Sequence, residues 1–180
     1  MRVARDRAEP CFRARPGPAE ARRAIRPARL SELTAVWQLA VACFSDDALS
    51  SAVLGLYLTG RNSTVLVVRS GSGLAGFMVL RVARDQGQPI GLIVSLGVDA
   101  ACRRNGIGRR LLRAAHRWCQ QAGAVRMRLD VARDNAGALA LYRDQGYRVV
   151  GTLPHYYGVG RDGLRMERPT PYPGVRRQSG

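Results

Sequence analysis

The chain has 180 residues, of which 46% are hydrophobic, and it carries a formal net charge of +16 at neutral pH. This length and composition suit one compact domain with a buried core and exclude an intrinsically disordered protein. No apolar stretch reaches the roughly 20 residues of a membrane-spanning helix, and the basic start MRVARDRAEP lacks the apolar segment of a secretory signal peptide.

All 29 basic residues are arginine. One interpretation is attraction to polyanions such as nucleic acid; the other is that arginine has replaced lysine throughout. The arginines are spread along the chain with few aromatic residues between them, which favours replacement and argues against a nucleic-acid partner. The cysteines stand far apart with no CxxC pair: Cys11, Cys43, Cys102 and Cys119. This spacing argues against a disulfide framework or a metal site and favours a reducing, cytoplasmic location.

The first 22 residues are rich in Arg, Ala and Pro without a period, which indicates a flexible N-terminal extension. A pattern of strands and helices runs from residue 23 to residue 168. We therefore expect one domain over 23–168 and a flexible tail over 169–180.

The first half of this domain predicts a short strand at 24–26 and a helix from an N-cap at Ser31 to Cys43. A second helix, capped by Asp46 or Asp47, is expected to end before Gly60. β-rich segments at 64–69 and 74–82 flank the sequence SGSG, which predicts a hairpin. The apolar run 90–98 predicts a further strand.

The second half begins with an amphipathic helix. Apolar side chains fall on one stripe at 3.6-residue spacing and basic ones on the opposite side: Ile107, Leu111, Ala115, Trp118 and Ala122 against Arg109, Arg110, Arg113, His116 and Arg117. Gly123 suits its C-terminal cap. A strand at 125–131 (Met127, Leu129 and Val131 on one face), a helix at 135–144 that stops at Gly146, and strands at 147–153 and 164–167 follow. This order predicts an α/β (α+β) domain with a single mixed central sheet flanked by helices.

Just before the amphipathic helix lies CRRNGIGRR, residues 102–110. The free N–H groups and the dipole of a helix N-terminus favour anions, and glycine lets a pyrophosphate approach the backbone. The spacing matches neither GxGxxG nor GxxxxGK[ST], so neither a Rossmann dinucleotide site nor a P-loop follows. From these residues alone, a phosphate cradle and an arginine-rich turn are equally good interpretations.

The wider context resembles a known family. A strand, the glycine turn, an amphipathic helix and a second strand precede Asn135, Ala138, Leu141-Tyr142 and Gly146-Tyr147. This order resembles the GNAT family of acetyl-CoA-dependent N-acetyltransferases, most specifically from Val98 to Met166. Within the family, LDVARDNAGALALYRDQGY and HYYGVGRDGLRM look most like the branch that acetylates protein N-terminal α-amines, typified by ribosomal-protein alanine acetyltransferases. The resemblance implies the GNAT fold, in which the central strands splay apart.

The resemblance also implies a cofactor site. In this family the backbone of the splayed strand pairs with the pantetheine arm and holds the acetyl carbonyl, which points to Leu96, Gly97 and Val98. The pyrophosphate would lie over the glycine turn, which comprises Arg103, Arg104, Asn105, Gly106, Ile107, Gly108 and Arg109. Asn135 aligns with a cofactor contact, and a simple helix N-cap is its alternative role. Acetyl-CoA is the expected co-substrate, and no metal is expected.

Two residues align with the family's proton-transfer groups. Tyr142 aligns with the tyrosine that protonates the departing CoA thiolate; the alternative is a core tyrosine on an amphipathic helix. Asp130 aligns with a glutamate that serves as general base. Strand alternation places Asp130 on one face with Arg128, so an ordinary surface ion pair is its alternative. Tyr156 and Tyr157 occupy the family loop that lines the acceptor slot.

The expected reaction is transfer of acetyl to a primary amine, foremost the α-amine of a protein or peptide N-terminus. Deprotonation at pH 7 costs about 1.4 kcal/mol for an α-amine of pKa about 8 and about 4.6 kcal/mol for a lysine. The short Asp130, acting through water, therefore suits an α-amine better. The alternatives are a small amine (amino sugar, polyamine or antibiotic) and a non-catalytic module that binds CoA or polyanions. The family's frequent proline near Ala100 and aromatic residue at Cys102 are absent, so the geometry of the glycine turn can differ.

Overall fold

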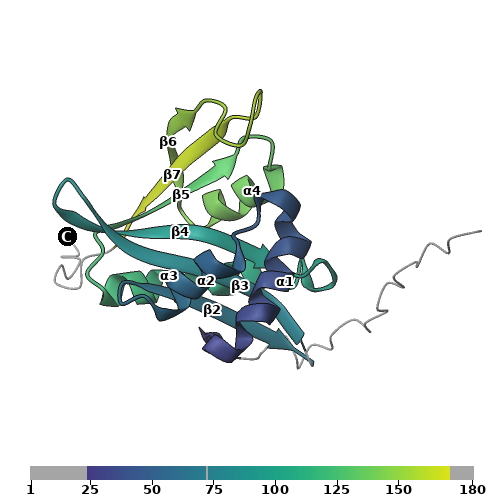
Figure 1. Ribbon diagram of the computed structural model, residues 1–180. Coiled ribbons are helices and arrows are strands. Elements are labelled where there is room, and N and C mark those ends of the chain that lie inside the picture. The colour runs from purple at the N-terminus through teal and green to yellow at the C-terminus, as the bar shows by residue number, and fades with distance from the viewer. Residues whose placement is uncertain (1–23, 72, 171–180) are drawn as a thin grey trace, which may run out of the picture.

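The computed structural model describes residues 24–71 and 73–170 (Figure 1). The expected N-terminal extension and most of the expected C-terminal tail lie outside the described residues. In the described part, the strands form one seven-stranded mixed sheet in the order β1-β2-β3-β4-β5-β7-β6. Their bounds are β1 (Arg26–Pro27), β2 (Ser63–Ser70), β3 (Gly73–Asp85), β4 (Gln88–Val98), β5 (Arg126–Ala132), β6 (Arg148–Leu153) and β7 (Gly163–Pro169). The predicted fold class is confirmed.

Two pairs of helices cover the two faces of the sheet (Figure 1). Helices α1 (Leu33–Phe44) and α2 (Ser51–Thr59) pack on side chains such as Val65, Val67 and Phe77. Helices α3 (Ile107–Gln121) and α4 (Ala136–Asp144) pack on the other face, against a larger core that includes Met127, Leu129 and Met166. Alternation along the strands separates the two cores because neighbouring side chains point to opposite faces. None of the helices in the described ranges is long and apolar enough to cross a membrane.

The sheet opens in its middle. Strands β4 and β5 are parallel, and their pairing runs from Ile90 opposite Arg126 to Ile93 opposite Leu129. Beyond Ile93, β4 stays paired with β3 as far as Val98, whereas β5 diverges towards its carboxyl end (Figure 1). The expected splay of the central strands is therefore present.

The predicted starts of the first two helices are wrong. Ser31 lies in a short 3-10 turn, η2 (Leu30–Glu32), and α1 begins at Leu33. The turn forms because the Glu32 carboxylate accepts hydrogen bonds from the backbone N–H of Arg29 and from the Arg26 guanidinium, at 2.7–3.0 Å. The second helix is capped by the Ser50 hydroxyl, which accepts from the N–H of Val53 at 3.3 Å. Asp46 and Asp47 instead belong to a second 3-10 turn, η3 (Ser45–Asp47).

The polar side of the amphipathic helix is also narrower than predicted. His116 is half-buried rather than exposed, and its Nε2 lies 3.0 Å from the hydroxyl of buried Tyr147. The helix buries Leu112 and Cys119 beside the predicted Ile107, Leu111 and Ala115. The apolar stripe thus packs on β2, β3 and β4, and His116 at its edge is covered by Tyr147 and Arg168, which the period of a single helix does not reveal.

Candidate active site

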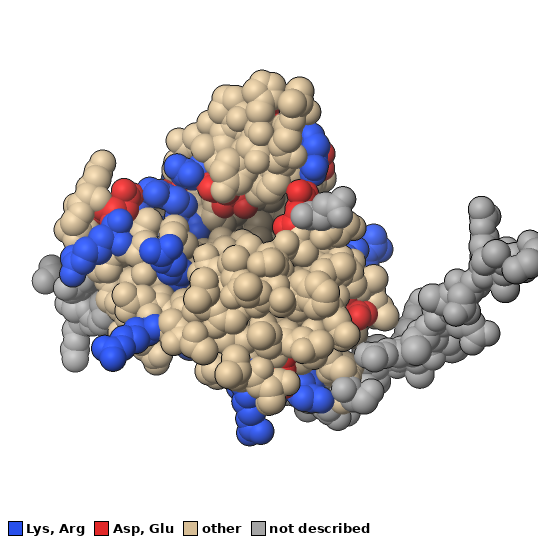
Figure 2. Space-filling model, in the orientation of Figure 1, with Lys and Arg blue, Asp and Glu red and all other residues tan. Residues whose placement is uncertain are grey.

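A cavity of about 420 Å³ lies where β4 and β5 part. Its walls come from the end of α1 with η3, from β4, from β5, from α4 and from the loop between β6 and β7. In Figure 2 the molecule is hollowed between the part built by β5–β7 and the part covered by α1 and α2, with acidic side chains around the hollow. The cavity therefore opens on the α1–α2 side of the sheet.

Strand β4 turns polar backbone groups into this gap. The N–H of Asp99 donates to the carbonyl of Ala75 in β3 at 3.0 Å, so alternation points the N–H and carbonyl of Val98 the other way, towards β5. The Val98 carbonyl accepts from Arg103 Nε at 3.2 Å and from Cys43 Sγ at 3.6 Å. The Val98 N–H thus faces the opening in the sheet, and Leu96 lines the cavity beside it.

Gly97 is held against an aromatic ring. A Cβ built at this position would lie 2.4 Å from Cε1 of Phe77 and 3.1 Å from Cys43 Sγ. The strand therefore passes closer to the α1 side than a larger residue permits. This close approach sets where the neighbouring Leu96 and Val98 stand in the opening.

The glycine turn forms the start of α3. Gly106 is the N-cap residue, with φ of +72°, and a Cβ at this position would meet no atom within 4 Å. Ile107 is buried in the core, so only its backbone N–H can serve a ligand. Gly108 packs against Leu141 of α4. The backbone at the helix start is thus exposed and clear of side chains, as an anion site requires.

The charged and amide side chains of the turn have local roles. Arg104 has φ of +61°. Arg109 forms an ion pair with Asp144 at 2.9 Å, and Asn105 Nδ2 donates to the carbonyl of Cys102 at 3.4 Å. Together with Arg103, which donates to Val98, these contacts fix the turn relative to β4 and α4. Residues 103–109 themselves do not line the cavity, and these contacts join the turn to the two elements that do.

Tyr142 lies on α4, and it also lines the cavity. Only 7% of its surface is exposed, and burial raises the pKa of its phenol above the ordinary value. The hydroxyl is therefore protonated at neutral pH, as a proton donor must be. Core packing, the alternative considered for this residue, is also observed: its ring packs edge-on against Tyr147, with centroids 5.8 Å apart. Ring packing leaves the hydroxyl in the cavity wall, so the proton-donor role stays a prediction.

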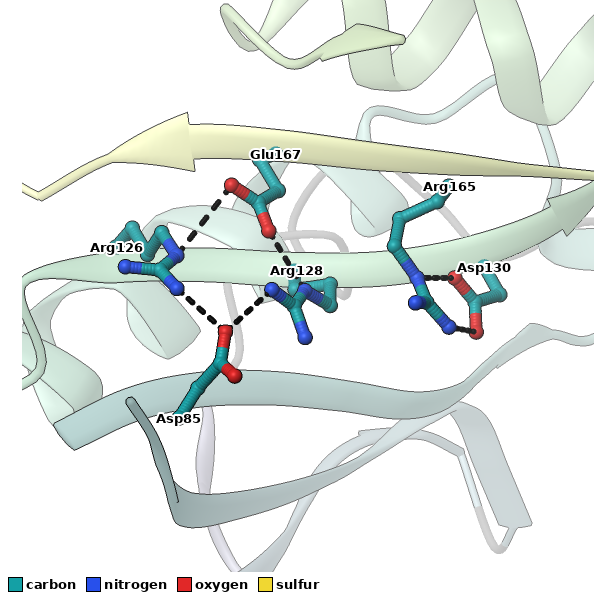
Figure 3. Close-up of polar contacts among 6 residues, drawn as sticks. All are labelled: Asp85, Arg126, Arg128, Asp130, Arg165 and Glu167. Atoms are coloured by element: carbon teal, nitrogen blue, oxygen red, sulfur yellow. Dashed lines mark hydrogen bonds and ion pairs between the residues drawn. The ribbon is translucent and has the colours of Figure 1, made fainter. Parts of the chain in front are cut away.

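Asp130 lies on β5 and lines the same cavity. Its expected neighbour Arg128 is not its partner. Arg165 of β7 donates to both carboxylate oxygens instead, from Nε at 2.9 Å and from Nη2 at 3.1 Å. Arg128 is bound by Glu167 and Asp85 (Figure 3). The expectation of an Arg128 contact is thus wrong, because the cross-strand register with β7 overrides proximity along β5.

The loop after β6 contributes its tyrosines unequally. Tyr157 lines the cavity and donates its hydroxyl hydrogen bond to the Asp130 carbonyl at 3.0 Å, and burial raises its pKa to about 12. Tyr156 packs edge-on against Tyr157 and is 56% exposed. His155 holds the loop itself, since its Nδ1 accepts from the N–H of Gly160 at 2.9 Å.

Asn135 caps α4, because its Oδ1 accepts from the N–H of Ala138 at 3.0 Å. Asn135 also lines the cavity. Its N-cap role is therefore observed, and its contact with the cofactor stays a prediction.

Sequence reasoning missed three residues of the site. Cys43 lines the cavity from α1, and burial raises the pKa of its thiol. Arg161 lines it from the β6–β7 loop and lies 3.7 Å from Asp47 of η3. Arg165 reaches it through Asp130. The alternation LRMER in β7 was a usable signal, since it places Arg165 and Glu167 on the face opposite Leu164 and Met166.

A parallel strand pair that splays beside an exposed helix start, with a phenol and a carboxylate in the wall of the gap, fits an acyltransferase that uses a coenzyme A thioester. The chain belongs to the acetyltransferase (GNAT) family, whose sequence model matches residues 33–147. It is therefore an N-acetyltransferase with acetyl-CoA as co-substrate.

The chain is also similar to individual acetyltransferases. The chain is 37% identical over 126 residues to N-alpha-acetyltransferase RimI of Mycobacterium tuberculosis, covering 68% of this chain and 77% of that protein. It is 37% identical over 73 residues to mycothiol acetyltransferase of Saccharomonospora viridis, covering 41% of this chain and 24% of the relative. The fold is similar to the crystal structure of the ribosomal-protein-S18-alanine N-acetyltransferase from Escherichia coli, with a TM-score of 0.74, 20% identity, and coverage of 87% and 99% of the two chains.

Proposed function

We propose that this enzyme acetylates the α-amine of a protein or peptide N-terminus. The observation that carries the proposal is the charge balance of the cavity. Its two carboxylates with described side chains are both paired with arginine: Asp130 with Arg165, and Asp47 with Arg161. A polycationic acceptor such as a polyamine needs free carboxylates, whereas a single α-amine of low pKa does not. The relationship to an N-alpha-acetyltransferase over 77% of its length supports the same acceptor.

In this proposal each cavity group has one task. Acetyl-CoA supplies the activated acetyl group. The Val98 N–H faces the opening and would stabilise the oxyanion of the tetrahedral intermediate. Asp130 would take the amine proton through a water molecule. The backbone of the glycine turn, with the flanking β4 residues and Asn135, would hold the coenzyme.

Tyr142 would donate its hydroxyl proton to the departing thiolate. A phenol of raised pKa is a weak acid in water, but the acceptor of its proton shares the same buried cavity. Burial raises the pKa of the Cys43 thiol there, so a thiolate is also disfavoured in this cavity. Transfer from phenol to thiolate therefore stays feasible without exposure to solvent.

The cysteines bear on the proposed location of the protein. The described cysteines, Cys43, Cys102 and Cys119, are free thiols, and this agrees with the proposed reducing, cytoplasmic compartment.

The test is a panel of acceptors incubated with acetyl-CoA, in which acetyl transfer is measured by the release of free CoA thiol. It contains peptides with a free α-amine, the same peptides with a blocked N-terminus and one internal lysine, and small primary amines. We expect turnover with free N-termini and at least about 100-fold lower kcat/KM with blocked, lysine-containing peptides, in line with the difference of about 3 kcal/mol between the two amines. Equal rates on both peptide sets would contradict the proposal.

A small amine is the second candidate, since a mycothiol acetyltransferase is among the relatives. The cavity of about 420 Å³ is large enough for such a molecule. Turnover of small amines in the panel, with no peptide acetylated, would establish this function instead.

A further inference from the structure

Strands β5 and β7 carry two Arg–carboxylate pairs of the same kind, two residues apart along each strand (Figure 3). Asp130 stands opposite Arg165, and Arg128 stands opposite Glu167. Each arginine contacts the carboxylate across from it, Arg165 at 2.9 and 3.1 Å and Arg128 at 2.6 Å. The two pairs are thus chemically alike and share one face of the sheet.

Their surroundings differ. Arg128 and Glu167 belong to a network with Arg126 and Asp85. Asp130 lines the cavity, and its side chain is 18% exposed. Of the two pairs, this one alone has its carboxylate in the wall of the cavity.

The contact with Arg165 has a geometric consequence. Two parallel N–H···O bonds fix the direction of a carboxylate, since both of its oxygens are held at once. A carboxyl oxygen has two lone-pair sites. Arg165 occupies one on each Asp130 oxygen and the Tyr156 side chain approaches a further one, so the carboxylate retains a site for a water molecule or an amine. The carboxylate therefore keeps its function while losing its freedom to rotate.

The contact also has an electrostatic consequence. Hydrogen bonding to Asp130 raises the pKa of the Arg165 guanidinium, which stays charged throughout the working range of the enzyme. The pair as a whole is neutral. An acceptor in its ammonium form accordingly gains little attraction from Asp130.

We propose that Arg165 is a positioning residue that fixes the Asp130 carboxylate and cancels its charge, so that the acceptor site takes the neutral amine in preference to its ammonium form. This inference rests on the proposed function in one respect, that Asp130 receives the proton of the acceptor. Holding the ammonium ion tightly would stabilise the ground state and raise the barrier to transfer. A neutral Asp130–Arg165 pair avoids that effect.

The experiment compares Arg165→Met, Arg165→Lys and the matched control Glu167→Gln in the full-length protein. The Met variant leaves Asp130 without its cation, the Lys variant returns the charge without the two-pronged contact, and Glu167→Gln weakens the neighbouring pair outside the cavity. Binding of a free-N-terminal peptide to the CoA-bound protein is measured by calorimetry. kcat and KM are measured in parallel, and the thermal midpoint Tm reports on folding.

We expect Arg165→Met to bind the peptide about 2- to 5-fold more tightly, the size of a partly exposed ion pair, while kcat falls about 10- to 100-fold. Arg165→Lys should restore the wild-type dissociation constant but only part of kcat. Glu167→Gln should change Tm without combining tighter peptide binding with a lower kcat. A fall in kcat with unchanged or weaker peptide binding in Arg165→Met would overturn the inference, since loss of structure alone produces that pattern.

Failure of the proposed function gives a different result. If wild-type protein turns over a small amine and no peptide, the acceptor assignment is wrong, and the same variants are measured with that amine. Tighter amine binding with lower kcat in Arg165→Met then still supports the inference, and the absence of that split still refutes it.

Discussion

At the scale of single residues, two tyrosines five positions apart have different surroundings. Tyr142 lines the cavity from α4, whereas Tyr147 is 2% exposed and lies in the core. The Tyr147 hydroxyl lies 3.0 Å from His116 Nε2 and 3.6 Å from the sulfur of Met127. The rings touch, so they form a natural comparison between a proposed catalytic hydroxyl and a structural one.

Removing each hydroxyl separately tests this assignment. Tyr142→Phe should lower kcat by about 10²- to 10⁴-fold, the usual contribution of a general acid, with Tm nearly unchanged because the ring still packs. Tyr147→Phe should lower Tm because it removes the buried hydroxyl's contacts with His116 and Met127, and kcat should stay close to wild type. Thiol release and thermal denaturation give both readings. Unchanged kcat in Tyr142→Phe would remove the proposed acid role.

The partner of Asp130 shows where prediction from sequence stops at this scale. Alternation along β5 correctly places Asp130 on the face opposite Leu129 and Val131. It cannot identify Arg165, because that contact depends on the register between two strands separated by 35 positions in the sequence. Tyr142 and Tyr157, in contrast, were assigned by their resemblance to family motifs that are local in the sequence, so no knowledge of strand register was needed.

At the scale of elements, the start of α3 depends on a backbone that is both left-handed and exposed. Gly106 has φ of +72° and open space around its Cα. Gly87, in the turn between β3 and β4, has φ of +78° and equally open space, but no helix begins there, whereas Gly106 is the N-cap of α3. The two glycines share backbone conformation and differ in location.

Substituting each glycine by alanine distinguishes an effect on coenzyme binding from the effect of backbone strain alone. Gly106→Ala and Gly87→Ala should each lower stability by about 1–2 kcal/mol, since an L side chain disfavours the left-handed region. Only Gly106→Ala should also weaken CoA binding, by about 10-fold or more, because relief of strain moves the N–H groups at the helix start. Calorimetric titration with CoA checks this. Equal CoA affinity in both variants would count against the phosphate cradle.

Element boundaries were predictable where a local signal decides them. The amphipathic period and Gly123 located α3, and Asn135 located α4, because their caps are formed by residues adjacent in sequence. The start of α1 was missed since Glu32 is drawn into contacts with Arg26 and Arg69, the latter 37 residues away. Contacts of the Glu32 carboxylate, most of them with Arg26 and Arg29, therefore moved a boundary that the cap pattern assigned to Ser31.

At the scale of the whole molecule, the large positive charge is unevenly distributed. No arginine occurs between residues 33 and 60, and the face over α1 and α2 is largely uncharged in Figure 2. On β5 and β7, arginines are matched by carboxylates in pairs and networks. The excess of arginine thus leaves the proposed acceptor side of the cavity close to neutral, which would let a single α-amine enter it without strong repulsion.

A second whole-molecule property is the dependence of stability on pH, which centres on His116. This residue joins three elements: it lies on α3, its Nε2 meets Tyr147 just before β6, and its ring nitrogens contact the guanidinium of Arg168 on β7. Burial, and then the charge of Arg168, lower the pKa of His116 from 6.5 to about 4. Protonation of His116 in the folded protein would place two cations together in a half-buried site.

Stability should therefore be highest above pH 6.5 and should decline as the pH falls from 6.5 towards 4, because the unfolded chain takes up a proton that the folded chain refuses. The decline is at most about 1.4 kcal/mol per pH unit, or about 3–6 °C in Tm for a chain of this size. Glu32, whose pKa hydrogen bonds from Arg26 lower to about 2, acts in a separate window below pH 4.5. Thermal denaturation of wild type and His116→Gln between pH 7.5 and 4.5 isolates the histidine. A decline of the same slope in both proteins would show that another group is responsible.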